Sequence, residues 1–323
     1  MNAGRGRVLA RMRVPRLALE HHGPVAPTGN RILFRAPSEA LRGIVRRFIV
    51  VESTAAHGDQ HLPDTGLVAA FRFRGECRLH GADTYQKAGQ SLGPRQAAGQ
   101  SPDPRQAAGQ SLDPLQIAPH SAVTGLWDRV RAHEHSADHA VVIAAFTPIG
   151  AAALFRQPLD ALANTTVDLV DLAAENRRAV SPELSDRLAD AVDHVERIRL
   201  VEELLLRLAG EQRADPLVAA AVEMIERTRA AVRIAALARR IGLSQRALER
   251  RFRRIVGASP RKFASLVRLQ HAAGLRATGA DFTTVAHAAG YSDQSHFVHD
   301  FKRFAGVAPG VFFGRRPPAA PLG

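Results

Sequence analysis

Charged side chains recur at helical spacing between residues 245 and 256. Arg246, Glu249, Arg250 and Arg253 lie three, four and seven positions apart, so they share one face of a helix, and apolar residues share the other. An arginine fork can donate to guanine N7 and O6, and a glutamate can accept from the N4 amino group of cytosine. The chemistry that this face offers is therefore the recognition of base edges in DNA.

A short helix and a tight turn are expected to position this basic helix. Apolar residues between Ile234 and Ile241 recur at helical spacing, which predicts the first helix. Gly242 permits a left-handed turn that a side chain would disfavour. Ser244 can then accept a hydrogen bond from a free backbone N–H at the start of the next helix. The order of helix, turn and basic helix predicts a helix-turn-helix whose second helix enters a major groove.

The same arrangement occurs a second time along the chain. Gly242 matches Gly290 at a distance of 48 positions, whereas Phe252 matches Phe301 at a distance of 49. One extra residue is therefore expected at the start of the second recognition helix. Two such units within about 100 residues resemble the AraC/XylS family of bacterial transcription regulators. The resemblance rests on S-x-R-x-L-x-R-x-F in residues 244–252 and on GYSDQSHFVHDFKRFAGVAP in residues 290–309, and it covers about a third of the chain.

This resemblance implies an α+β protein whose residues 213–316 form an all-α, homeodomain-like double helix-turn-helix domain that binds double-stranded DNA. It places Gln294, Ser295, His296 and His299 at the base-contacting positions of the second unit, beside Arg246, Glu249 and Arg250 in the first. Where many relatives carry arginine, His299 stands here, so weaker recognition is expected from the second unit. The residues expected to contact phosphate, without sequence information, are Arg253, Arg254, Lys302 and Arg303.

A helix between the two units is expected to set their spacing. Ser259 can cap it, Pro260 suits its first turn, and it is predicted to reach about Arg276. At 1.5 Å per residue it would span roughly 25 Å. That length is suited to holding two recognition helices about one turn of DNA apart.

The basic charge of the chain is concentrated on the same segment. The 323 residues are enough for about two domains, and their net charge is +13. Residues 215–316 hold 18 Lys and Arg against 7 Asp and Glu, a net +11. Basic charge gathered on one domain is typical of a protein that binds nucleic acid.

Cys77 is the only cysteine, which excludes an internal disulfide and a cysteine-rich metal site. No apolar run approaches the roughly 18 residues that a membrane-spanning helix needs. The N-terminus has scattered arginines but no apolar core, so it is not a signal peptide, and a cytoplasmic location is expected. The sequence leaves open whether Met1 or Met12 is the start.

Residues 31–180 are expected to form a β-rich domain, with residues 140–146 as a buried strand. Part of this region, with the leucine-rich stretch after it, resembles the N-terminal sensor domain, of uncharacterised ligand, of many regulators of the family. Residues 86–117, which contain three copies of a polar decapeptide, are expected to be a disordered insertion, with a protein-binding role as the less favoured alternative. Residues 1–30 and 317–323 are expected to be disordered tails.

Residues 181–212 predict one amphipathic helix followed by a linker. Ser181, Pro182 and Glu183 combine a cap, a first-turn proline and an acidic first turn. A change of phase in the apolar spacing argues against a long coiled coil. Packing against its own domain is therefore favoured over a dimer seam.

Histidines near the strands raise the question of a metal site. His133, His135 and His139 form H-x-H-x3-H, and His57 and His61 are four apart. Imidazoles near strands could hold zinc or iron. No glutamate follows at the spacing of cupin-like enzymes, so isolated surface histidines without a metal or other cofactor are the favoured interpretation.

The chain is also not expected to be an enzyme. A DNA-repair methyltransferase fused to this helix-turn-helix would need reactive cysteines, and Cys77 lies within a predicted strand. A redox-sensing role for this residue would require an exposed thiolate. The sequence thus predicts a transcription factor that responds to an unidentified small-molecule effector, with RNA polymerase and a second copy of the chain as further partners.

Overall fold

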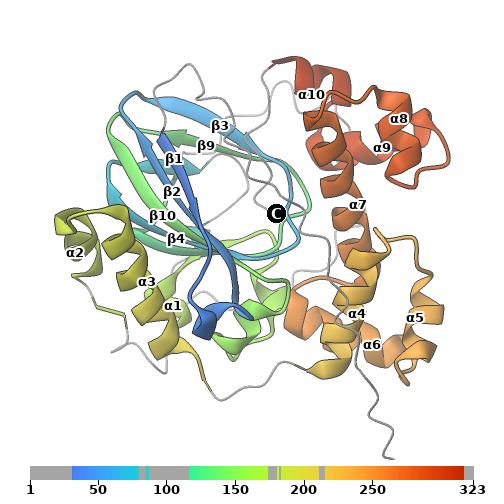
Figure 1. The fold of residues 1–323 in the computed structure, drawn as a ribbon, viewed down its shortest axis with the longest axis horizontal. Helices are drawn as coiled ribbons and strands as arrows, with labels where there is room; N and C mark the ends of the chain where they lie inside the picture. The colour runs from blue at the N-terminus through green and yellow to red at the C-terminus, as the bar shows by residue number, and fades with distance from the viewer. Residues whose placement is uncertain are drawn as a thin grey trace, which may run out of the picture.

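The computed structural model describes residues 31–79, 85–86, 116–173, 180–181, 183–210 and 215–315. Two β-sheets with flanking helices form the N-terminal domain, and a group of helices from Pro216 onward forms the C-terminal domain (Figure 1). The predicted α+β class is confirmed. The predictions for residues 1–30 and 317–323, and for the linker residues 211–214, lie outside the described residues.

The larger sheet has seven strands in the order β1-β2-β10-β4-β8-β11-β6, antiparallel except between β11 and β6. Its strands are β1 Arg31–Arg35, β2 Val45–Ser53, β4 Val68–Arg74, β6 Tyr85–Gln86, β8 Ser121–Thr124, β10 His139–Phe146 and β11 Thr166–Asp168. The buried strand predicted at residues 140–146 is confirmed as β10. It pairs with β2 on one side and β4 on the other, and all but one of its residues are buried. Interior strands covered on both faces carry such continuous apolar runs.

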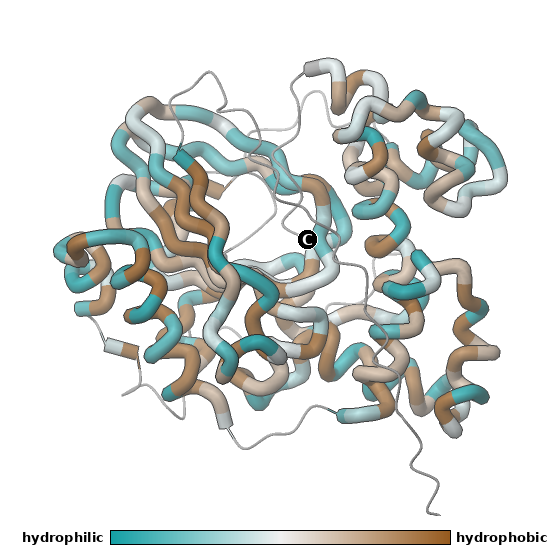
Figure 2. The backbone as a smooth tube through the Cα atoms, in the orientation of Figure 1, coloured by the Kyte–Doolittle hydropathy of each residue, from teal (hydrophilic) through white to brown (hydrophobic). Residues whose placement is uncertain are grey.

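The smaller sheet has four strands in the order β3-β9-β5-β7, and two of these strands are polar. They are β3 His57–His61, β5 Cys77–Leu79, β7 Gln116–Ile117 and β9 Arg131–His135. Hydrophilic residues predominate along β3 and β9, whereas the central strands of the larger sheet are hydrophobic (Figure 2). The predicted insertion 86–117 is too wide at both ends, because Gln86 belongs to β6 and residues 116–117 pair with β5. Residues 87–115 lie outside the described part of the chain.

The single amphipathic helix predicted within residues 181–212, before the linker, is two helices, α2 Leu184–Asp190 and α3 His194–Leu208. The carboxylate of Asp193 accepts from the backbone N–H of Glu196 and starts α3. Arg197 donates to the carbonyls of Leu188 and Ala191, which the end of α2 leaves without helical partners. Contacts of α2 with β4 and of α3 with β10 confirm that this segment packs on its own domain. The short helix α1 Leu169–Leu172 follows β11.

Seven helices form the described C-terminal domain: α4 Pro216–Arg227, α5 Ile234–Arg240, α6 Gln245–Val256, α7 Pro260–Ala277, α8 Phe282–Ala288, α9 Gln294–Ala305 and α10 Pro309–Arg315. The 18 residues of α7 span about 27 Å and connect the two units, as predicted. Ser259 caps α7 by accepting from the N–H of Lys262. Helices α5 and α8 lie on the far side of α7 from the sheets (Figure 1).

Candidate nucleic-acid interface

The first helix-turn-helix unit consists of α5, a turn at Gly242, and α6. Gly242 has a positive φ of 75°, and the Ser244 hydroxyl accepts from the N–H of Ala247, so the predicted turn and cap are both confirmed. Leu248 and Phe252 are fully buried, and the Phe252 ring meets that of Phe263 on α7 edge-on. Because the apolar side of α6 is fixed in the core, its charged side must face outward.

Arginines with no partner dominate the outward side of α6. Arg246, Arg250 and Arg254 are exposed, and none has a hydrogen bond or ion pair with another described residue. Glu249 and Arg253, predicted to contact a base and a phosphate, instead bind each other, with 2.9 Å between Oε1 and Nη2. Such an exposed pair one helical turn apart stabilises a helix by a few tenths of a kcal/mol, so DNA could separate it at little cost.

In the second unit, Asp293 is the extra residue predicted at the start of the recognition helix. Gly290, with a φ of 78°, makes the turn, and Asp293 caps α9 by accepting from the N–H of His296. This backbone bond, with another from the Ser292 hydroxyl, lowers the pKa of the Asp293 carboxyl. Ser292 matches the cap residue Ser244 in the sequence, but the cap of α9 is the next residue, Asp293.

Several predicted contact residues of the second unit are held by neighbours. The Thr283 hydroxyl donates to Oε1 of Gln294 over 3.0 Å. His296 Nδ1 lies 3.1 Å from the Ser292 hydroxyl, and its ring meets Tyr291 edge-on.

Farther along α9, Arg303 forms an ion pair with Asp300 and lies over the Phe304 ring. Ser295, His299 and Lys302 are exposed, and their side chains have no hydrogen bond or ion pair with another described residue. With respect to the described part of the chain, the outward side of α9 thus carries one cation without an ion pair, Lys302, where α6 carries three.

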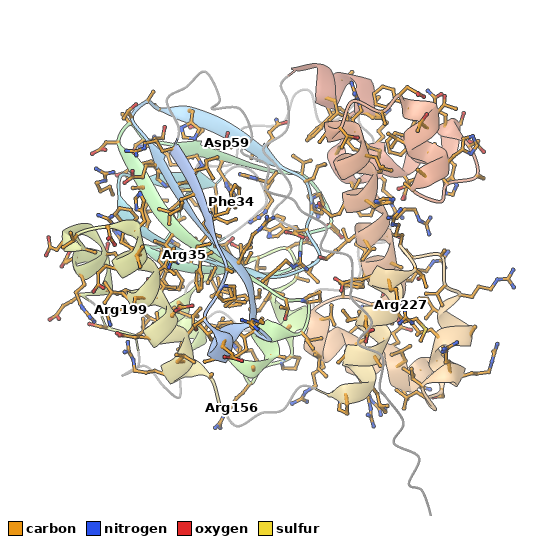
Figure 3. All side chains as sticks on the ribbon, viewed as in Figure 1. Phe34, Arg35, Asp59, Arg156, Arg199 and Arg227 are labelled. Carbon is orange, nitrogen blue, oxygen red and sulfur yellow. The ribbon has the colours of Figure 1, made fainter. Side chains whose placement is uncertain are left out.

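Two further arginines lie at the end of the first helix of the first unit. Arg239 and Arg240, in the last turn of α5, are exposed and have no ion pair with any described residue. Arg227, the last residue of neighbouring α4 and labelled in Figure 3, forms an ion pair with Glu223 instead. The first helix of such a unit crosses the DNA backbone. The run Arg239-Arg240 just before Gly242 was the sequence feature that could have identified these phosphate-contact candidates.

The N-terminal domain contacts α6, α7 and α9. On α7, Lys262 forms an ion pair with Asp128 over 2.7 Å, and the amide of Gln270 donates to the carbonyl of Pro63. Burial by itself would raise the pKa of Asp128, but the bond and charge of Lys262 hold it below its ordinary value. The backbone N–H of Val130 donates to the carbonyl of Phe304 near the end of α9 over 2.8 Å.

The interpretation of the N-terminal histidines as isolated surface residues is wrong. The rings of His57 and His135 stack with centroids 4.8 Å apart, and those of His135 and His139 lie 4.3 Å apart. His139 is only 2% exposed. Pairing of β3 with β9 joins histidines that are more than 70 positions apart in the chain.

Two helix-turn-helix units with cationic recognition helices, held on one connecting helix, define a DNA-binding domain. Residues 237–315 match the family model described as "Helix-turn-helix domain". A "Putative AraC-like transcription regulator" of Streptomyces lividans is 34% identical over 110 residues, which are 33% of this chain and 36% of that relative. The C-terminal domain is an AraC-type helix-turn-helix domain. The alignment spans only about a third of the relative's length.

Two solved structures are also similar. That of a probable AraC family transcriptional regulator from Rhodopseudomonas palustris CGA009 has 33% identity and a TM-score of 0.28, and the match covers 31% of this chain and 97% of that one. That of ToxT from Vibrio cholerae has 10% identity and a TM-score of 0.41, and the match covers 88% of this chain and 98% of that one. Among the described helices, none has the length and hydrophobicity to cross a membrane.

Proposed function

We propose that the whole chain is a sequence-specific transcription regulator rather than an enzyme. The observation that carries this proposal is that α6, in a duplicated helix-turn-helix domain, exposes three arginines that have no ion pair with any described residue. Arg246 and Arg250 would hydrogen-bond guanine edges, and Arg254, with Arg239 and Arg240, would contact phosphates. Glu249 would accept from cytosine once Arg253 turns to a phosphate.

In the second unit, Gln294, Ser295, His296 and His299 would face base edges, with Lys302 and Arg303 on phosphates. Thr283 would hold Gln294 in place through the hydroxyl contact described above. The N-terminal domain would receive the signal, and its contacts with α6, α7 and α9 would pass it to the DNA-binding helices. A small-molecule effector, RNA polymerase and a second copy of the chain are the partners that this role would require.

Two steps test this function with the full-length chain. DNA affinity sequencing on fragmented genomic DNA should first yield an enriched motif, and the best site then serves in titrations. Arg246→Ala should remove discrimination at one base pair at a cost of about 1–3 kcal/mol, while Arg254→Ala should weaken specific and scrambled duplexes alike.

Arg199→Ala, on α3 of the N-terminal domain, provides a control with the same loss of charge. It should leave both affinities unchanged. The absence of any enriched motif would contradict sequence-specific binding. Equal effects of Arg246→Ala on specific and scrambled DNA would contradict its assignment as a base-contacting residue.

A further inference from the structure

The inner face of the small sheet gathers polar side chains that the DNA-binding function does not use. Strand pairing places His57 and Cys77 on either side of His135, and Asp59 and Leu79 on either side of His133. Along β3 and β9 these residues are half-buried, while the residues between them, Gly58, Gln60 and Glu134, are exposed. Polar groups that turn inward from a sheet require partners, because burial removes their bonds to water.

Within the described part of the chain, His139, on the neighbouring strand β10, lacks a partner that burial would demand. The Nδ1 atom of His139 is buried and has no hydrogen-bond partner among the described residues. Its Nε2 lies 3.3 Å from Nδ1 of His135, so one imidazole faces another. A neutral imidazole has one nitrogen lone pair that can accept a proton or a metal ion. Each neutral ring brings one lone pair and one N–H, so a ring whose N–H does not point at a neighbouring ring leaves a lone pair of the cluster available to a metal ion.

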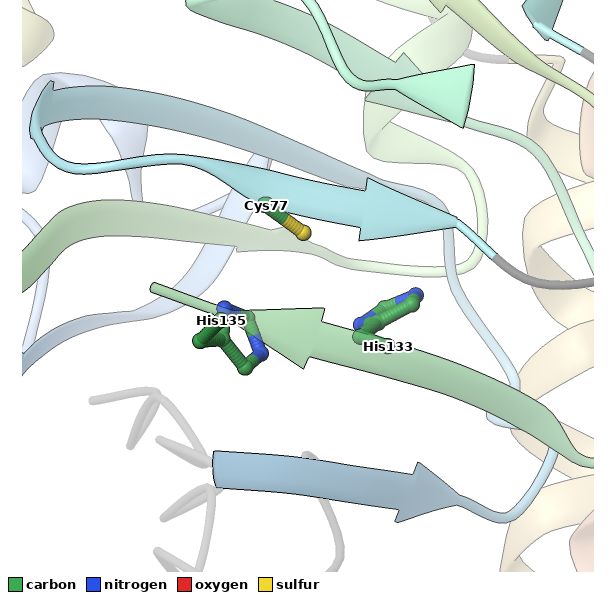
Figure 4. A group of neighbouring side chains, drawn as sticks. All are labelled: Cys77, His133 and His135. Carbon is green, nitrogen blue, oxygen red and sulfur yellow. The ribbon is translucent and has the colours of Figure 1, made fainter. Parts of the chain in front are cut away.

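We propose that Cys77, His133 and His135 bind a divalent transition-metal ion of the zinc class. Their ligand atoms all lie within 4.8 Å of one another. Figure 4 shows both histidines on one strand, with the sulfur of Cys77 directed toward them from the adjacent strand. Tetrahedral zinc with ordinary Zn–S and Zn–N bonds needs ligand atoms roughly 3.5 Å apart. Small side-chain rotations would bring the three ligands to that separation.

The donor atoms of the cluster select the kind of ion. Arg72 and Arg131 lie close enough to act electrostatically on the histidines, and both oppose any cation, so binding must come from the donor atoms. Hard ions such as Ca²⁺ and Mg²⁺ depend on several carboxylates and are disfavoured, because the three proposed ligands include none. Thiolate and imidazole donors favour zinc-class ions. Burial raises the pKa of the Cys77 thiol to about 11, so a bound ion would displace the thiol proton to solvent, as coordinating thiols release theirs.

Three protein ligands leave the fourth tetrahedral position open, as in sites that exchange a ligand rather than in closed structural sites. His139 contacts His135 and would act as a positioning residue that orients the His135 ring toward the ion. A second group, His57, Asp59 and His135, shares one residue with the first. It contains no sulfur and holds an internal contact of 3.1 Å between His57 and Asp59 (labelled in Figure 3), so it is the weaker candidate.

The site is connected to the DNA-binding domain through β9, which carries two of the ligands, and through the neighbouring strand β3. Strand β9 begins at Arg131, directly after Val130, whose N–H is bound to the end of α9. Strand β3 pairs with β9 and ends at His61, two residues before Pro63, whose carbonyl accepts from Gln270 on α7. Closing the ligands around an ion would pull on β9 directly and on β3 through the pairing of the two strands. We therefore expect metal occupancy to change DNA affinity, an expectation that rests on the proposed function.

Metal binding is tested first on the chelator-treated full-length protein. Competition with a chromogenic chelator should give one Zn²⁺ per chain, and Ca²⁺ or Mg²⁺ should not compete. Bound Co²⁺ should show a thiolate-to-cobalt charge-transfer band, which reports on Cys77 because the chain has no other cysteine. This measurement on the wild-type protein needs no variant to fold. Absence of Zn²⁺ binding, or of the thiolate band, would overturn the proposal.

Variants then assign the ligands. Cys77→Ser, His133→Ala and His135→Ala should each weaken Zn²⁺ binding at least about tenfold, a loss that even outer-shell changes can produce. His287→Ala, an exposed histidine on α8, is the matched control and should have no effect. Circular dichroism of each metal-free variant checks its fold. Loss of binding in His57→Ala but not in Cys77→Ser would overturn the assignment in favour of the second group.

DNA titrations with and without Zn²⁺ test the connection. A change in DNA affinity on adding Zn²⁺ that occurs in the wild type and is absent in His133→Ala would support the connection. Zn²⁺ binding with unchanged DNA affinity would overturn the connection alone. No DNA binding in either state would contradict the proposed function while leaving the metal site standing.

Discussion

Two glycines at equivalent ends of the recognition helices allow the contact between the domains to be measured. Gly257 and Gly306 end α6 and α9 with positive φ angles of 86° and 72°. Alanine in either left-handed position should cost roughly 1–2 kcal/mol of stability from backbone strain alone. A Cβ at Gly306 would meet nothing within 4 Å, whereas one at Gly257 would lie 3.1 Å from the carbonyl oxygen of Leu159 in the N-terminal domain.

The difference in stability between the Gly257→Ala and Gly306→Ala variants therefore measures the contact of α6 with the N-terminal domain. The backbone at Leu159 would have to shift to relieve this contact, so Gly257→Ala should be the more destabilising, by about 1 kcal/mol. For a domain of this size class, each kcal/mol corresponds to a fall in melting temperature of roughly 2–8 °C. Calorimetry of both variants in the full-length chain measures the two melting temperatures. Equal melting temperatures would refute the packing of α6 against Leu159.

Three further predictions concern DNA binding and the repeat. Affinity of the full-length chain for duplex DNA should fall steeply between 50 and 200 mM salt, by about tenfold or more, because bound arginines release counterions; a flat response in a filter-binding titration would contradict phosphate contacts. Arg250→Ala should reduce specific affinity more than His299→Ala, because an imidazole cannot form the paired bonds of an arginine fork. His299→Ala should change the free energy of specific binding by less than about 1 kcal/mol, and titration of both variants at fixed salt and pH measures the difference. Replacing residues 88–115 by a short Gly/Ser linker should leave the melting temperature unchanged, whereas also replacing Gln116 and Ile117, which pair with β5, should lower it.

The helix-turn-helix units could be predicted because their determinants are local. Caps, left-handed glycines and apolar spacing act within a few residues, so Gly242, Ser244 and Ser259 have the predicted roles in the structure. The 49-residue offset also predicted an extra residue at the start of α9, although only the structure identifies it as the cap Asp293. The assignment of individual residues to bases or phosphates stays a prediction.

The arrangement of the N-terminal domain could not be predicted because it depends on distant pairings. His57 meets His135 only through the register of β3 with β9, and Cys77 reaches the same residue through β5. No local rule determines that register. The break between α2 and α3 was missed for a related reason: Arg197 satisfies carbonyls of α2 from a turn within α3, a contact that apolar periodicity does not encode.

The contacts between the domains limit how a signal could reach DNA. The N-terminal domain contacts the end of α6 at Gly257, the middle helix α7 at Lys262 and Gln270, and the end of α9 at Phe304. The contacts with α6 and α9 are at the C-terminal ends of these recognition helices, whereas base contacts in such units come from the N-terminal residues. The N-terminal domain can therefore stay in place while α6 and α9 approach a groove. A signal that moved it would change the angle or spacing of the two recognition helices without touching any base-contacting side chain, and specificity and regulation could then be altered by separate substitutions.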